Sequence, residues 1–289
     1  MDELVQYNFH SYLEYSKANF DPDFVTISDL ERDLIAPKEE FSIGAKCFVC
    51  DEEQSLLVDF QSAAPARGGV TRRPNWRERL VCPVCNLNNR MRAAIHLLEI
   101  NSDLNVNSAI YLGERLTYLY LNLKQRYPGL VGSEYLGEEF DAGYVDENSI
   151  RHEDMTALSF SDDSCDAIMH FDVLEHIPDF RGALSEALRC LRAGGNLFFS
   201  APFRINEPNT LVRAEVVDGD ISHIEEPEYH GDPVNPSEGI LCYYHFGWDL
   251  LDEMKRIGFF EPKIHLYWSK DFGYLGGYQV FISGSKPLP

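Results

Sequence analysis

The sequence predicts an α/β fold with a mainly parallel sheet, together with a small N-terminal metal-binding module. From residue 108 onward, short apolar runs of the kind that buried strands show alternate with runs of helical periodicity. Strands that are separated by helices form βαβ units, in which the strands are parallel. Ahead of this region stand two pairs of cysteines, each with two residues between its members.

Each element follows from its own run of residues. The strands that we expect cover residues 108–112, 130–134, 150–154, 165–171 and 196–201, and an edge hairpin covers 264–268 and 278–283. The helices that we expect cover residues 117–127, 179–191 and 248–257. Pro128 and Gly129 end the first of these helices, and Gly194 and Gly195 stop the second. Nearer the N-terminus we expect a helix or two before residue 46, a strand at 56–60 and a helix at 91–100.

The sequence contains a CxxC…CxxC pattern made of Cys47, Cys50, Cys82 and Cys85. Two thiolates from one tight turn reach a single tetrahedral ion, and a second such turn completes a closed site of four cysteines. Closed coordination leaves no position for a reacting water, so we expect a structural ion, and zinc in particular. Redox pairs and disulfides are the alternatives. We expect small buried hydrophobic residues at the other three cysteines, Cys165, Cys190 and Cys242.

The net charge limits the classes of partner that the protein can bind. The formal net charge of −22 opposes general binding to polyanions. One stretch of this acidic chain is basic and contains Glu78 as its single acid. Its seven arginines are Arg67, Arg72, Arg73, Arg77, Arg79, Arg90 and Arg92. Such a stretch is usually a solvated face, but beside a metal module it also suits a nucleic-acid surface. The N-terminus has no secretory signal and no apolar run reaches the roughly 18 residues of a membrane span, so we expect a cytoplasmic protein with no membrane partner.

Four short blocks follow one another between residues 151 and 203. They are Glu153–Phe160, Asp163–Asp166, Asp172–Ile177 and Arg192–Gly195. Each block alone is common, but in this order and at about this spacing they resemble the class I S-adenosylmethionine-dependent methyltransferases. The resemblance covers roughly residues 107–202 and, more loosely, the tail after residue 239. It implies a Rossmann-like α/β fold, in which a mainly parallel seven-stranded sheet has helices on both faces.

The resemblance also implies where S-adenosylmethionine binds. In an open parallel sheet, a ligand lies beyond the carboxyl ends of the strands. Glu134, at the end of the second expected strand, has the place of an acid that accepts hydrogen bonds from the ribose hydroxyls. Asp154, at the end of the third, has the place of an acid that accepts the adenine amino group, and Met155 follows it. The alternative for each acid is a surface carboxylate.

The fourth expected strand ends at Asp172, which the resemblance places near the positively charged sulfonium. Glu175 and His176 belong to the same motif. Either they are part of the site, or they cap and orient the helix that follows.

The first loop departs from the family pattern. Family members usually carry an acid followed by a Gly-x-Gly turn, whose bare backbone lets the amino-acid end of the cofactor approach. Here Gly113 is the single glycine, and the side chains of Arg115 and Leu116 would crowd that approach. Either Glu114 and Thr117 hold the amino-acid end along a different loop path, or binding is weakened.

The segment of residues 203–246 is expected to close over the methyl acceptor, as in the family that the sequence resembles. Methyl transfer needs an acceptor held in line with the sulfonium and often a base that removes its proton. His230 and Tyr229 are the first candidates for catalysis, and His223 is the next. The His, Glu and Asp residues at 223–232 also suit a metal ion. An acidic, solvated loop is the alternative.

These observations predict an N-terminal helical segment with a zinc-ribbon-like module at residues 1–95 and a methyltransferase domain at residues 96–289. The expected enzyme uses S-adenosylmethionine and a structural Zn²⁺, and it methylates a small-molecule or sugar-linked acceptor. An RNA methyltransferase that uses the arginine-rich module is the second hypothesis. A non-catalytic binding protein with a degenerate cofactor loop is the third. The acceptor and the oligomeric state stay open.

Overall fold

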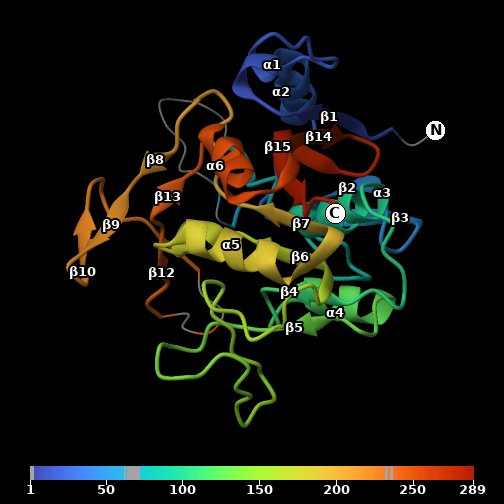
Figure 1. Cartoon of the computed structure of the whole chain (residues 1–289). Helices are drawn as coiled ribbons and strands as arrows, with labels where there is room; N and C mark the ends of the chain where they lie inside the picture. The colour runs from blue at the N-terminus through green and yellow to red at the C-terminus, as the bar shows by residue number, and fades with distance from the viewer. Residues whose placement is uncertain (1–2, 62, 64–71, 232–233, 235–236) are drawn as a thin grey trace. The chain divides into compact units, whose positions relative to one another are not determined.

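The computed structural model describes residues 3–61, 63, 72–231, 234 and 237–289 (Figure 1). The chain divides into two compact units. The first consists of Met1–Asn8, Ser16–Asp103 and His265–Phe281, and the second of Phe9–Tyr15, Leu104–Ile264 and Ile282–Pro289. The first unit thus combines the cysteine-containing region with a segment from the C-terminal part of the chain. The predicted domain boundary after residue 95 remains a prediction.

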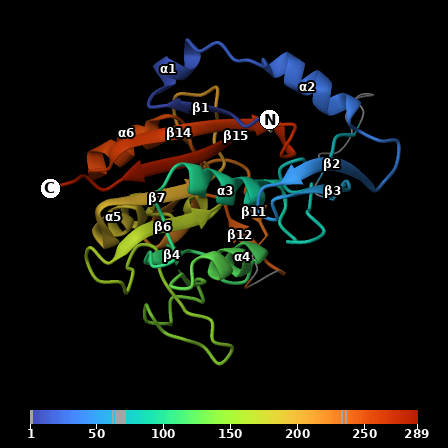
Figure 2. The ribbon, with the colours of Figure 1, turned by 90° about the vertical axis from the view of Figure 1, so that its right-hand side faces the viewer.

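Seven strands form one sheet in the order β1-β14-β15-β7-β6-β4-β5. They are β1 (Val5–Phe9), β14 (Phe260–Ser269), β15 (Tyr274–Ser285), β7 (Leu191–Ser200), β6 (Cys165–Phe171), β4 (Ile110–Leu112) and β5 (Val131–Gly132). The pairs β4–β5, β4–β6 and β6–β7 are parallel. Strand β15 is antiparallel to β7, its neighbour in Figure 2. This mixed sheet with a parallel part confirms the predicted Rossmann-like α/β fold. The predicted hairpin forms as β14 and β15, but it is not the edge, because β1 follows β14 in the strand order.

The helices of the second unit begin at the side chains that the sequence places there. Thr117 caps α4 (Tyr118–Arg126), and its hydroxyl accepts a hydrogen bond from the Tyr120 amide at 3.1 Å. Asp179 caps α5 (Phe180–Cys190) through the Gly182 amide at 2.9 Å. The helix α6 (Asp249–Ile257) lies beside α5 (Figure 1). These boundaries agree with the sequence prediction to within a residue or two.

The glycine pair at 194–195 does not stop α5, contrary to the prediction. The helix ends at Cys190, and β7 starts at the next residue, so both glycines lie inside the strand. A Cβ on Gly195 would come within 2.9 Å of the Arg192 carbonyl oxygen and 3.1 Å of the Asp166 carbonyl oxygen. The glycine therefore serves a close backbone approach between strands.

The predicted strand at 150–154 is wrong as a strand. Only isolated bridges form there, Glu134 with His152 in parallel and Val145 with Arg151 in antiparallel orientation. Side-chain hydrogen bonds stabilise this segment instead of a strand ladder. The buried Glu153 carboxylate accepts hydrogen bonds from Arg151 Nε at 2.7 Å and from the Ser159 amide at 2.9 Å.

The polar segment after Pro202 contains short antiparallel strand pairs rather than a loop alone. β8 (Leu211–Val212) pairs with β13 (Tyr244–His245), β9 (Ala214–Val217) with β10 (Asp220–His223), and β11 (Tyr229–His230) with β12 (Ile240–Leu241). The third pair fixes His230 opposite Ile240. Asp232, which belongs to the predicted His/Glu/Asp cluster, lies outside the described residues.

The first unit contains α2 (Phe24–Asp33), the hairpin of β2 (Phe41–Cys47) and β3 (Glu52–Val58), and α3 (Asn89–Ile100). The helix α2 and the short helix α1 (Tyr12–Ser16), which lies largely in the second unit, confirm the helix or two expected before residue 46. The strand β1 was not predicted. Buried Glu31 accepts hydrogen bonds from Trp268 Nε1 and from the Gly276 amide. Throughout the described ranges, the helices are too short or too polar to cross a membrane.

Candidate functional sites

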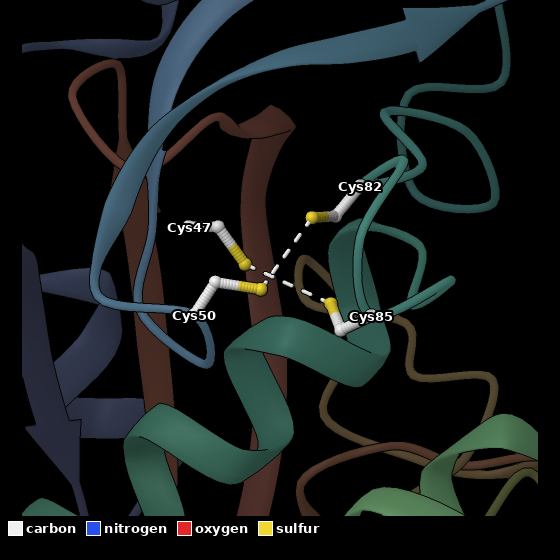
Figure 3. Close-up of side chains that lie close together, drawn as sticks. All are labelled: Cys47, Cys50, Cys82 and Cys85. Atoms are coloured by element: carbon white, nitrogen blue, oxygen red, sulfur yellow. Dashed lines mark hydrogen bonds between the residues drawn. The ribbon is translucent and has the colours of Figure 1, made fainter.

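Two tight turns bring the four cysteines of the predicted metal module together (Figure 3). The first turn follows β2 and the second lies at residues 83–85. The Cys47 and Cys85 sulfurs are 3.8 Å apart, and so are those of Cys50 and Cys82. A disulfide needs about 2.05 Å between its sulfurs, so these cysteines are free thiols rather than disulfides.

The spacing of the four sulfurs fits tetrahedral coordination. Zinc–sulfur bonds of about 2.3 Å put the corners of a tetrahedron about 3.8 Å apart. The Cys85 thiol donates a hydrogen bond to Cys47 and lowers the pKa of Cys47 to about 5. The backbone amide of Cys50 adds to this effect. Thiolates are the form that a metal binds, and Cys47 is favoured in this form, whereas burial raises the pKa of the Cys50 thiol to about 12.

The arginines near this module have structural partners. Arg92 is fully buried, donates to the Phe272 carbonyl oxygen at 2.6 Å and lies over the Tyr274 ring. Arg79 pairs with Asp59, and Arg90 pairs with Glu78. These contacts neutralise or bury charge that the RNA hypothesis needs on the surface. Arg67 lies outside the described residues.

Acidic residues follow the carboxyl ends of three neighbouring parallel strands in the second unit. Gly113 and Glu114 come after β4, Glu134 comes soon after β5, and Asp172 comes directly after β6. Because the three strands are parallel neighbours, these residues meet at one edge of the sheet. The side chains of Glu114 and Glu134 are both buried.

Glu134 holds the loop that follows β4. Its Oε1 accepts hydrogen bonds from the backbone amides of Arg115 and Leu116, each at 2.7 Å. The Arg115 guanidinium lies over the Tyr120 ring, 4.2 Å from its centroid. The loop therefore uses a carboxylate from the next strand as its support, in place of the flexibility of a second glycine.

The other predicted cofactor residues occupy the same unit. Asp154 Oδ1 accepts hydrogen bonds from the Thr156 amide and hydroxyl at 2.8 and 2.7 Å. Met155 is buried, and its sulfur lies 3.6 Å from the Tyr111 hydroxyl. The same sulfur would lie 3.7 Å from a Cβ on Gly113, so Met155 and Gly113 are neighbours. The Thr117 hydroxyl caps α4, a role the sequence prediction did not assign to it.

Asp172 has a backbone conformation that favours glycine, with a φ of 57°. Its Oδ1 accepts a hydrogen bond from the Ser200 hydroxyl at 2.9 Å, and its amide donates to the Ser200 carbonyl oxygen. Such strain at the end of a strand is common where a side chain must point in a particular direction. Two residues earlier, burial lowers the pKa of His170 to about 3.

The predicted catalytic residue His230 lies with Glu175 and His176. His230 Nδ1 is 3.3 Å from His176 Nε2 and 3.7 Å from Glu175 Oε1. His230 Nε2 is 2.9 Å from Glu228 Oε1, which also lies 3.2 Å from His245 Nε2. Burial raises the pKa of the Glu175 carboxyl to about 7. The carboxylates of Glu175 and Glu228 raise the pKa of His230 to about 9.

The other two catalytic candidates are not brought into this cluster. Tyr229 is 58% exposed, as the alternation of side chains along β11 requires when His230 faces inward. His223 is exposed on β10, where its backbone pairs with Ala214. Within the described ranges, His223 belongs to none of the close groups of metal-ligating side chains.

Residues 119–199 match a family model described as "Methyltransferase domain". A curated protein of Mycolicibacterium smegmatis (strain ATCC 700084 / mc(2)155), described as a "Probable S-adenosylmethionine-dependent methyltransferase", is 41% identical over 56 residues. This match covers 19% of the present chain and 22% of that protein. The chain thus spans less than a quarter of the curated relative that it matches.

Solved structures are also similar. An S-adenosylmethionine-dependent methyltransferase from Mesorhizobium loti has a TM-score of 0.43 and 14% identity, over 70% of this chain and 100% of that one. A phosphoethanolamine N-methyltransferase of Haemonchus contortus, in complex with S-adenosyl-L-methionine, has a TM-score of 0.40 and 12% identity, over 68% and 52% of the two chains. Residues 119–199 are thus similar to a methyltransferase domain, and the 56-residue match to the curated protein supports the predicted S-adenosylmethionine-dependent enzyme class.

Proposed function

We propose that the protein transfers a methyl group from S-adenosylmethionine to a small-molecule or sugar-linked acceptor. The observation that carries the proposal is the set of acids at one edge of the parallel strands, inside and beside the segment that matches the methyltransferase domain. Glu114, Glu134 and Asp172 make this edge acidic. A negative surround favours the sulfonium, which carries the positive charge of the cofactor.

Each predicted cofactor residue has a place in this proposal. Glu134 accepts the ribose hydroxyls while its Oε1 keeps its bonds to the loop. Asp154 accepts the adenine amino group, and Met155 packs near it. Gly113 and Glu114 face the amino-acid end of the cofactor, and Thr117 contributes through the helix that it caps.

We propose that His230 acts on the methyl acceptor. Its Nε2 faces the Glu228 carboxylate, which keeps a proton on that nitrogen. In the neutral form of the ring, reached above its raised pKa of about 9, Nδ1 presents a lone pair. Nδ1 is the atom that acts on the acceptor proton during in-line displacement at the methyl carbon. Tyr229 and His223 remain candidates for contacts to the acceptor from the exposed face.

The four-cysteine module binds a structural zinc ion in this proposal. The two 3.8 Å sulfur separations support it, since they match the edges of a tetrahedral site. An ion there supplies cross-links between the β2–β3 hairpin and the second turn. No open position is left for chemistry.

Calorimetric titration of the full chain with S-adenosylmethionine tests the function. We expect one binding site per chain, and Glu134→Gln should weaken binding about tenfold or more, because a neutral amide replaces a charged acceptor. The matched control is Glu147→Gln, at an exposed glutamate, which should bind as the natural chain does. Failure of the natural chain to bind the cofactor would favour the non-catalytic protein with a degenerate loop.

A further inference from the structure

Glu175, His176 and His230 bring one carboxylate oxygen and two ring nitrogens face to face. His176 Nε2 lies 3.3 Å from His230 Nδ1 and 3.6 Å from Glu175 Oε1, and the last two atoms are 3.7 Å apart. Ligands at about 2.0–2.1 Å from a tetrahedral ion stand about 3.3–3.4 Å from one another. The three atoms therefore have nearly the spacing of three corners of a coordination tetrahedron.

The far nitrogen of each ring is held by an acceptor. His176 Nδ1 lies 2.8 Å from the Leu241 carbonyl oxygen, and His230 Nε2 lies 2.9 Å from Glu228 Oε1. A carbonyl oxygen can only accept, so the proton of His176 sits on Nδ1 and its Nε2 offers a lone pair. Metal-binding histidines are oriented in this way by a carbonyl or carboxylate behind them.

Glu228 is the outer partner rather than a ligand of this group. Its Oε1 already lies within ion-pair distance of His230 Nε2 and 3.2 Å from His245 Nε2. Its Oε2 lies 3.2 Å from Arg213 Nη2. A carboxylate that is held by a guanidinium is a poor site for a second cation. It is well suited to keep the His230 ring in place.

Glu175 is buried at ion-pair distances from two histidines but, within the described part of the chain, without a hydrogen bond to either of its oxygens. Its side chain is fully buried. Burying a carboxylate is costly unless an opposite charge or hydrogen bonds accompany it. The short helix Leu174–His176 points this carboxylate at the two histidines, where a bound cation would supply the missing charge.

We propose that Glu175, His176 and His230 bind a divalent first-row transition-metal ion through one oxygen and two nitrogens, with a coordination position left open. The donor set differs from the four sulfurs of the cysteine module, so the two sites prefer different ions. The open position would take an oxygen of a small ligand and lower the pKa of a bound hydroxyl. When the ion is bound, His230 is its ligand and does not take the acceptor proton; a hydroxyl made more acidic by the ion would release its proton to solvent water. The binding itself does not depend on the proposed methyl transfer.

Cobalt(II) titration of the full chain tests the site, with the cysteine module loaded with zinc beforehand and no S-adenosylmethionine present. We expect one further equivalent of Co²⁺ with the weak visible bands of nitrogen and oxygen ligands, and without the strong near-ultraviolet bands of thiolates. The variants His230→Asn and Glu175→Gln should each weaken Co²⁺ binding about tenfold or more. His223→Asn, at the exposed histidine of β10, is the matched control and should bind Co²⁺ unchanged.

His230 is 28% exposed, so its variant should fold even if Glu175→Gln does not, and thermal melting of each variant monitors this. The proposal is overturned if no Co²⁺ binds beyond the zinc-loaded module, if the bound Co²⁺ shows thiolate bands, or if folded His230→Asn binds Co²⁺ as tightly as the natural chain. None of these results bears on cofactor binding, which is measured separately.

Discussion

Glu134 Oε1 lies 2.7 Å from the backbone amide of Leu116, so one carboxylate joins the end of β5 to the loop after β4. Glu134 accepts a second amide from the same loop, that of Arg115. The residue proposed to hold the ribose therefore also supports the loop proposed to face the amino-acid end of the cofactor. In the proposed site, contacts to the ribose and to the amino-acid end both depend on this side chain.

The first prediction follows from this double role. Glu134→Ala should lower both the thermal stability and the affinity for S-adenosylmethionine, because two loop amides and the ribose lose an acceptor. The expected loss of binding free energy is about 1–3 kcal/mol. Glu134→Gln keeps an oxygen for the amides, so it should lose affinity with a smaller change in melting temperature. Calorimetry and thermal melting measure the two effects, and equal affinity in all three proteins would remove Glu134 from the site.

The second prediction concerns the cysteine module. Cys47→Ser or Cys82→Ser should each remove one equivalent of zinc per chain relative to the natural protein, because a closed tetrahedral site loses a ligand. The first unit should also lose stability, since ion binding and local folding are coupled. Cys165→Ser changes a buried cysteine far from the module in sequence and serves as the control. Mass spectrometry of the metal content measures the zinc per chain in each variant. An unchanged zinc count in both variants contradicts the prediction.

The sequence predicts well those elements whose signals are local. The strand at Cys165–Phe171 was predicted with the bounds that the structure has, because an apolar run there stops at a charged residue. The helices α4 and α5 begin where Thr117 and Asp179 provide caps. Three buried cysteines outside the module were also predicted correctly.

What the sequence could not predict depends on contacts between distant residues. His176 and His230 are 54 positions apart, and no local pattern shows that β11 brings them together. The segment expected as a strand at 150–154 forms only isolated backbone bridges, and the Glu153 side chain binds Arg151 and the more distant Ser159. Apolar alternation alone does not reveal such contacts.

The third prediction uses the strained backbone of Asp172. Asn tolerates a positive φ at least as well as Asp and can still accept a hydrogen bond from the Ser200 hydroxyl, so Asp172→Asn should stay within about 1 kcal/mol of the natural stability. The loss of negative charge near the proposed sulfonium should lower kcat/KM for methyl transfer at least tenfold. Asp163→Asn is a matched control, because Asp163 also has a positive φ of 54°. Should Asp172→Asn and Asp163→Asn have the same activity, Asp172 has no part in the reaction.

The fourth prediction concerns pH and His170. Burial lowers the pKa of this side chain from 6.5 to about 3 in the folded protein, whereas it titrates near 6.5 in the unfolded chain. His170 therefore contributes stability above pH 6.5, and this contribution is lost as the pH falls from 6.5 toward 3, because the unfolded chain binds the proton first. Between pH 7 and pH 5 the expected loss is about 2 kcal/mol.

His170→Phe removes the titrating group but keeps a ring that stacks on Phe199, so it should abolish this part of the pH dependence. Denaturant unfolding of the natural chain and the variant at pH 7 and pH 5 measures the difference between their slopes. His223→Asn, which removes an exposed histidine, should leave the slope of the natural chain intact. A natural slope that survives in His170→Phe would mean that His170 is protonated in the folded protein, and that its burial does not keep it neutral.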